Sequence, residues 1–122
     1  MISSLPRKVQ AQSPFSVGRV VFKELPTTLM DSEYYFDLDH GMLKIHLYLR
    51  PQVDLRKVWE ILAESFGHEN LKWSKEIPHT FEDGTEIRGS IFIGLKVTFD
   101  KMFHALNRIV EIDRNLLMAK QP

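Results

Sequence analysis

Hydrophobic and polar residues alternate with a period of two along residues 33–49, on both sides of the dipeptide His40-Gly41. This alternation predicts two half-buried strands, which a two-residue turn with positive φ at Gly41 would join into a hairpin. The predicted register gives an apolar face with the pairs Leu38 and Leu43, Phe36 and Ile45, Tyr34 and Leu47. It gives a polar face with the pairs Asp37 and Lys44, Tyr35 and His46, Glu33 and Tyr48. A one-residue slip would mix these faces, so the pattern predicts which side chains point inward.

A second hairpin is expected over residues 73–97, around the dipeptide Asp83-Gly84. A two-residue loop would mix polar and apolar residues on one face, so we favour a three-residue loop with Gly84 in the left-handed region. The register turns His79 inward, into the core or a cleft. Pro78 requires that its strand lie at a sheet edge or be locally broken. The expected pairs are Phe81 and Thr85, His79 and Ile87, Ile77 and Gly89, and the inner face continues through Ile91, Ile93 and Leu95.

The beginning of the chain differs in composition from the rest. Residues 1–15 are rich in Ser, Gln and Pro, and they lack both periodicity and the apolar segment of a signal peptide. The stretch from Val17 to Leu25 is rich in β-branched residues and stops at Pro26, which predicts a first strand at a sheet edge. We therefore expect a flexible N-terminal arm over residues 1–15 and a single domain over residues 16–122.

Two segments follow the helical period of about 3.6 residues. The first begins after Asp54, a good N-cap residue, and ends at Gly67, a typical residue just past a helix. The second begins after Thr98 and runs from Phe99 to about Lys120, with apolar residues over about half of its circumference. This arc is wider than a sheet of two hairpins should require, and the excess predicts a partner, most simply a second copy of the chain. The expected interface residues are Met102, Leu106, Ile109, Ile112, Asp113 and Leu116.

The two hairpin-plus-helix segments also resemble each other in sequence. Residues 53–59 can be aligned with residues 97–103 if only Pro51 and Gln52 are treated as an insertion. An internal duplication of a ββα unit is one explanation, and the general likeness of any strand followed by an amphipathic helix is the other. Either explanation gives the order β-ββα-ββα. The expected fold is therefore α+β, a two-layer sandwich of a mostly antiparallel sheet with both helices on one face.

Composition narrows the class of protein. The chain has 122 residues, of which 43% are hydrophobic and 26% are charged, which suits one globular domain. Cys is absent, so disulfides and thiolate chemistry are excluded. Sixteen Lys and Arg residues balance sixteen Asp and Glu residues, so no net charge attracts the protein to nucleic acid. No apolar run is long enough to span a membrane, and we expect a cytoplasmic protein.

The polar face of the first hairpin is the main candidate for a functional surface. Its rings and charges could stack a base or hold an anionic small molecule, and the alternative is a solvated face with cross-strand charge pairs. The five histidines of the chain lack the spacing of metal ligands, so we expect neither a metal nor another cofactor. The candidate ligand-binding residues are Tyr35, Asp37, Lys44, His46, Tyr48, Arg50 and His79.

Asp113 stands inside the apolar arc of the last helix. A carboxylate there must be paired, protonated or beyond the edge of the core. It could pair with Arg108, Arg114 or a basic residue of another subunit, or it could line a pocket with His79.

Three functions stay open on this basis. No catalytic signature is visible, so we favour a small non-enzymatic binding or regulatory protein that dimerises through its C-terminal helix and binds a protein or small ligand. The alternative is a small enzyme, or a protein that binds a nucleotide or another anionic ligand, using His46, Tyr48 and Arg50. Nucleic-acid binding is the third function, and the balanced charge disfavours it.

Overall fold

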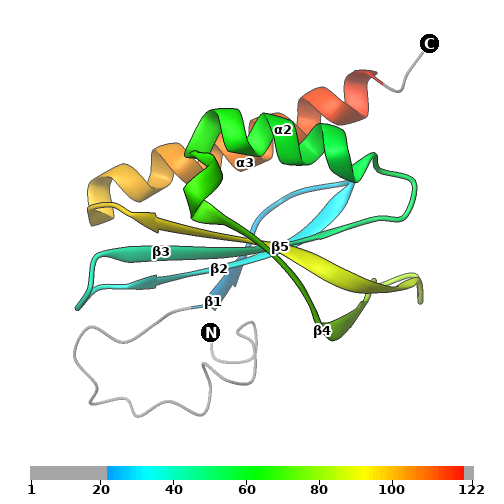
Figure 1. Ribbon diagram of the computed structural model, residues 1–122, viewed down its shortest axis with the longest axis horizontal. Helices are drawn as coiled ribbons and strands as arrows, with labels where there is room; N and C mark the ends of the chain where they lie inside the picture. Colours follow the sequence, from blue (N-terminus) through cyan, green and yellow to red (C-terminus); the bar gives the residue numbers. More distant parts are fainter. Residues whose placement is uncertain (1–21, 120–122) are drawn as a thin grey trace.

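The computed structural model describes residues 22–119, and of residues 22, 76 and 77 it describes the main chain alone. A five-stranded antiparallel sheet forms one layer and two helices form the other (Figure 1). This arrangement confirms the predicted α+β class and its element order. The predicted arm, and residues 17–21 of the predicted first strand, lie outside the described residues. The elements are β1 (Phe22–Glu24), β2 (Met30–Asp37), β3 (Met42–Leu49), α2 (Leu55–Phe66), the short 3-10 turn η2 (His68–Asn70), β4 (Leu71–Thr80), β5 (Glu86–Lys96) and α3 (Phe99–Ala119).

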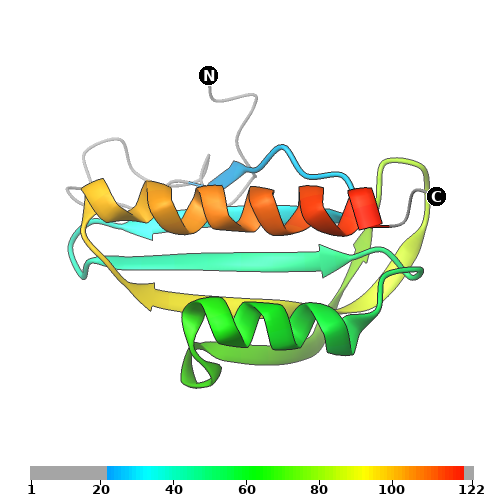
Figure 2. The same cartoon turned by 90° about the horizontal axis from the view of Figure 1, so that it is seen from above.

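The strands lie in the order β1-β2-β3-β5-β4, and every neighbouring pair is antiparallel. The second strands of the two hairpins, β3 and β5, therefore lie side by side in the centre of the sheet. Viewed from above, α3 lies over the β2 side of the sheet and α2 lies over the β4 side, with β3 visible between the two helices (Figure 2). Each helix thus covers the half of the sheet that the strands of the other ββα unit form. The duplication of the unit remains a prediction.

The first hairpin keeps the predicted faces but not the predicted register. Phe36 pairs with Leu43, whereas the sequence suggested Leu43 opposite Leu38. Residues 38–41 form a four-residue loop in place of the two-residue turn, and Gly41 has the expected positive φ of 61°. The shift between the two registers is two residues, which leaves every side chain on its predicted face. In this register Leu38 lies in the loop, where its side chain is 58% exposed instead of buried as predicted.

The second hairpin has the predicted register at its turn. His79 pairs with Ile87, and the Phe81 N–H donates to the Thr85 carbonyl oxygen over 2.7 Å. β4 is an edge strand in the described sheet, and its pairing with β5 shifts between Ser74 and Pro78, as the proline predicted. The expected pair of residues 77 and 89 falls inside this irregularity. Beyond it, the turn end of the hairpin curls away from the helices (Figure 1).

The helix α2 has both predicted ends. The Asp54 carboxylate accepts a hydrogen bond from the Lys57 N–H over 3.3 Å, as an N-cap residue does. Gly67 follows the helix with φ of 93°, and its N–H donates to the Ala63 carbonyl oxygen. On the buried side, Val58 and Leu62 are 0% and 1% exposed. These two side chains hold the helix on the sheet.

The helix α3 buries the residues that the sequence assigned to an interface. All six are at most 9% exposed within a single chain, and the five apolar ones belong to the same core cluster as the sheet residues. The wide apolar arc therefore needs no partner at these positions, which corrects the predicted interface. The physical reason is that α3 packs into the core cluster of the sheet, is bonded through Asp113 to the segment before β2, and is bonded through Arg108 to Ser65 of α2. The six residues are Met102, Leu106, Ile109, Ile112, Asp113 and Leu116.

The buried carboxylate of Asp113 has its partners within the chain. Its Oδ2 accepts a hydrogen bond from the Thr28 N–H, and its Oδ1 accepts one from the Leu29 N–H, each over 2.8 Å. The side chain is therefore neither an intersubunit ion pair nor a partner of His79, both of which the sequence left open. It ties the C-terminal half of α3 to the segment that leads into β2.

Candidate ligand-binding face

The sheet face that points away from the helices carries the predicted polar residues, and we call it the open face. On β3, Leu43, Ile45 and Leu47 are 0% exposed beneath the helices. Strand alternation therefore turns Lys44, His46 and Tyr48 to the open face. Which neighbours these three meet depends on the register and on the curl of the β4–β5 hairpin.

A row of stacked rings crosses one end of the open face. The Tyr48 and His79 rings are nearly parallel, at 8°, with centroids 4.0 Å apart. On the other side of Tyr48, the His46 ring lies 6.4 Å away at 11° and itself contacts Phe92 at 4.9 Å. Ring pairs at such distances and angles pack favourably. Three strands, β3, β4 and β5, thus contribute to one aromatic surface.

Two carboxylates of β2 hold this row in place. The Tyr48 hydroxyl donates to Glu33 Oε1 over 3.1 Å, and His79 Nε2 lies 2.7 Å from Asp31 Oδ2. Burial of the Tyr48 ring raises the pKa of its hydroxyl well above the usual range, and the charge and hydrogen bond of Glu33 raise it further. Tyr48 therefore stays a neutral hydrogen-bond donor at physiological pH.

Arg50 extends the row at its outer end. Its guanidinium lies over the Phe81 ring, 4.4 Å from the centroid, and Phe81 meets His79 edge to face at 5.0 Å. Arg50 Nη1 also donates to Asp83 Oδ2 over 2.9 Å. Hydrogen bonds from Thr85, and then the one from Arg50, lower the pKa of the Asp83 carboxyl. The Arg50 guanidinium is therefore already paired with a carboxylate, which an anionic ligand would have to displace.

A cavity of about 310 Å³ lies beside His79, between the ring row and the segment before β2. Four carboxylates and one imidazole line it, so carboxylates predominate there even though the whole chain carries no net charge. Carboxylates gathered around one cavity favour a positively charged ligand group. The cavity is lined by Glu24, Leu25, Thr27, Asp31, Ser32, Glu33, His79 and Glu82.

The structure brings together four of the seven predicted ligand-binding residues, namely His46, Tyr48, Arg50 and His79. His79 was expected to point inward, but its ring packs on Tyr48 at the open face. The pairing irregularity in β4 and the positive φ of 123° at Gly89 in β5 interrupt the regular alternation of side chains between the two faces. The side chain of His79 therefore lies on the face opposite to the predicted one.

The other three predicted residues form separate local pairs. Lys44 lies over the Tyr35 ring at 5.6 Å, directly across the strands, so these two form a cation–π pair beside the ring row. Asp37 lies at the hairpin turn, where its carboxylate contacts His40 Nδ1 over 2.7 Å. The hydrogen bond with His40 lowers the pKa of the Asp37 carboxyl. Asp37 therefore stabilises the turn and takes no part in the ring row.

Four contributors to this face were not among the selected ligand-binding residues: Asp31, Glu33, Phe81 and Phe92. Glu33 and Phe92 alternate with buried neighbours, so the strand period placed them on the open face even though neither was selected as a ligand-binding residue. Asp31 precedes the predicted start of its strand, and Phe81 was assigned to the inner face. No local sequence pattern placed Asp31 or Phe81 on this face, because their contacts depend on how the β4–β5 hairpin curls.

Comparisons with known proteins leave the site to be interpreted from its own geometry. No protein-family model, curated protein or solved structure matches the chain. In the part of the chain that the structure describes, no group of three His, Cys, Asp or Glu side chains is arranged to hold a metal ion. None of the described helices is long and apolar enough to cross a membrane.

Proposed function

We propose that this protein is a small non-enzymatic binding protein whose open face binds a positively charged group. The group is either a compact organic cation or a Lys or Arg side chain of a partner protein. The observation that carries the proposal is the cavity beside His79, which four carboxylates line next to one end of the ring row. Aromatic rings and carboxylates together are the surroundings that suit ammonium and guanidinium groups.

The pairing of the polar groups supports binding rather than catalysis. Tyr48 is paired with Glu33, His79 with Asp31, and Arg50 with Asp83. Such mutual pairs hold the side chains in place before a ligand arrives, which lowers the entropy cost of binding. The six α3 residues that the sequence assigned to self-association are core positions and take no part in this proposal.

An enzyme or an anion-binding protein that uses His46, Tyr48 and Arg50 is the alternative. The stacking of Arg50 on Phe81 favours it, because a guanidinium on a ring can also bind an anion. An anion would have to displace Asp83 from Arg50 and approach the nearby carboxylates. This electrostatic cost also weighs against nucleic acid.

Nuclear magnetic resonance titration of the backbone amides tests the proposal. The probes are agmatine, a compact dication, and adenosine monophosphate as the anion. We expect agmatine to shift the amide resonances around Asp31, Glu33 and His79, and added salt to weaken the effect. A response to the nucleotide but not to agmatine would favour the alternative, and no response to either probe would refute a ligand site at this face.

Charge-neutralising variants provide the matched control. Glu33→Gln and Glu82→Gln should each weaken agmatine binding about two- to fivefold, because each removes one carboxylate of the cavity. Glu64→Gln removes a carboxylate from an exposed position on α2, in the other layer. If all three variants lose affinity equally, agmatine binds through general charge attraction and the cavity is not its site.

A further inference from the structure

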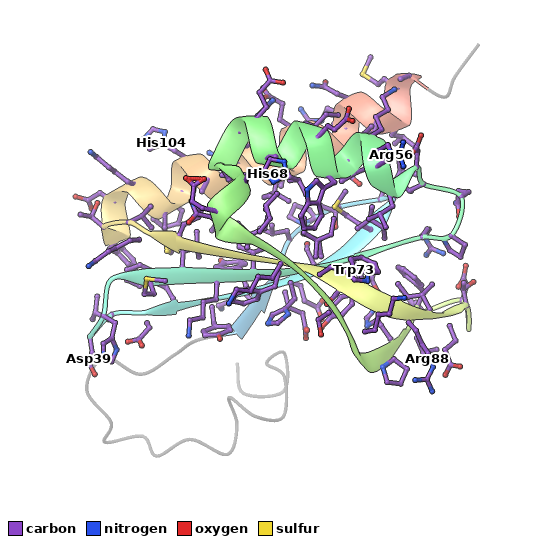
Figure 3. All side chains as sticks on the ribbon, viewed as in Figure 1. Asp39, Arg56, His68, Trp73, Arg88 and His104 are labelled. Atoms are coloured by element: carbon purple, nitrogen blue, oxygen red, sulfur yellow. The ribbon has the colours of Figure 1, made fainter. Side chains whose placement is uncertain are left out.

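A larger groove lies on the helix side of the sheet, where α2 overhangs the edge strand β4. Its volume is about 840 Å³, and it is lined by side chains from α2, η2 and β4. Figure 3 shows Arg56 and His68 towards opposite ends of α2, with Trp73 of β4 beneath the helix. The groove is separate from the open face, which lies on the other side of the sheet.

Large apolar side chains line this groove without being covered by the chain. Leu55 and Trp73 are each 40% exposed, and Trp59 is half-buried between them and the core. The strand beneath is the edge of the described sheet, with β5 as its one neighbour there. Exposed apolar groups beside an edge strand are typical of a surface that another chain covers.

The Trp73 ring has a fixed position in the groove. It lies across Gly89, where a Cβ atom added to the glycine would stand only 2.3 Å from ring atom Cζ2. Gly89 also has a positive φ of 123°, which side-chain-bearing residues rarely adopt. The ring therefore rests on the main chain of β5 as a preformed contact surface.

The rim of the groove carries one positive and one negative side chain, whose charges are complementary to those of the same rim on a second copy of the chain. Arg56 and Glu60 are exposed, lie one helical turn apart on α2, and form no ion pair with another described residue. When two copies of such a helix pack antiparallel about a two-fold axis, the Arg of each copy faces the Glu of the other. A two-fold interface requires this kind of self-complementarity.

We propose that a second copy of the chain occupies this groove, with the two α2 helices antiparallel. Arg56 of each copy pairs with Glu60 of the other, and the two Trp59 rings meet near the axis. The first part of β4 lies beneath α2 at the same edge of the sheet (Figure 2), and its Trp73 side chain therefore also belongs to this interface. The dimer expected from the sequence thus forms through α2 instead of α3, and its formation does not depend on the function of the open face.

Tryptophan fluorescence can follow this dimer directly. The chain has two tryptophans, and both of them line the groove. Dilution of the wild-type protein should therefore shift the emission to longer wavelength as Trp59 and Trp73 become exposed to water. Sedimentation equilibrium should show a mass falling from twice 14.3 kDa towards 14.3 kDa over the same range. A monomer at every concentration would overturn the proposal.

A charge-swap series tests where the dimer forms. Arg56→Glu, and separately Glu60→Arg, turns both attractive pairs into repulsive ones and should weaken dimerisation about tenfold. The double variant Arg56→Glu, Glu60→Arg restores both pairs and should return dimerisation to the wild-type level. Lys57→Glu changes a charge on the flank of α2 that faces away from the groove and is the matched control. A dimer that neither single variant weakens would place the interface elsewhere and refute the proposal.

Discussion

Replacement of Asp113 by Ala should destabilise the protein strongly, although the residue does not line the candidate cavity. The carboxylate is 3% exposed and accepts hydrogen bonds from the N–H groups of Thr28 and Leu29, both over 2.8 Å. Hydrogen bonds to a charged group contribute roughly 1.5–3 kcal/mol each to stability. The variant also removes a buried charge whose desolvation opposes folding, so the two contributions do not simply add. We expect a loss of about 2–4 kcal/mol in the free energy of unfolding.

The assay is urea unfolding followed by circular dichroism. The slope of the free energy of unfolding against urea concentration shows whether each variant exposes as much surface on unfolding as the wild type does. Asp113→Asn should fall between the wild type and Asp113→Ala, because the amide keeps one acceptor but points an N–H donor at another donor. Asn115→Ala, an exposed change on the same helix, should stay within about 0.5 kcal/mol of the wild type. If Asp113→Ala unfolds like Asn115→Ala, the carboxylate does not hold the segment before β2 and our account of the buried charge is wrong.

Three further predictions follow from burial and backbone geometry. Gly89→Ala should cost roughly 1–3 kcal/mol, since its φ is positive and Trp73 lies where the new methyl group would stand, whereas Gly94→Ala should be far milder in the same urea titration. Ile109→Lys places a charge at a position that is 1% exposed and should cost about 4 kcal/mol or more; a variant that melts at the wild-type temperature would contradict the burial of this side chain in the core. The pKa of Tyr48 is higher in the folded than in the unfolded state, so this group's contribution is complete below about pH 10 and is lost as the pH rises further. Tyr48→Phe should reduce that alkaline loss in unfolding experiments at several pH values, and an unchanged pH dependence would contradict the burial argument.

Local sequence patterns were enough to predict the elements, the faces of the first hairpin and the ends of α2. The alternation along β2 and β3 predicted that Ile45 is buried and that His46 points away from the helices, because strand alternation depends only on local backbone geometry. The ends of α2 were equally local, since Asp54 and Gly67 act on main-chain groups within one turn. The order of hairpins and helices then left few ways to bury all the apolar faces, which is why the α+β sandwich was predictable.

The register of the first hairpin and the composition of the open face depend on how the whole chain packs. Two registers that differ by two residues keep the same faces, so the hydrophobic pattern could not distinguish between them. The structure has the register with the four-residue loop. The partners of Asp113 lie 84 and 85 positions away in the chain, beyond any local signal. The stack of His79 on Tyr48 likewise depends on a pairing irregularity and on the curl of one hairpin. Local periodicity determines which side of a strand a residue occupies, whereas the residues it meets depend on how distant segments pack together.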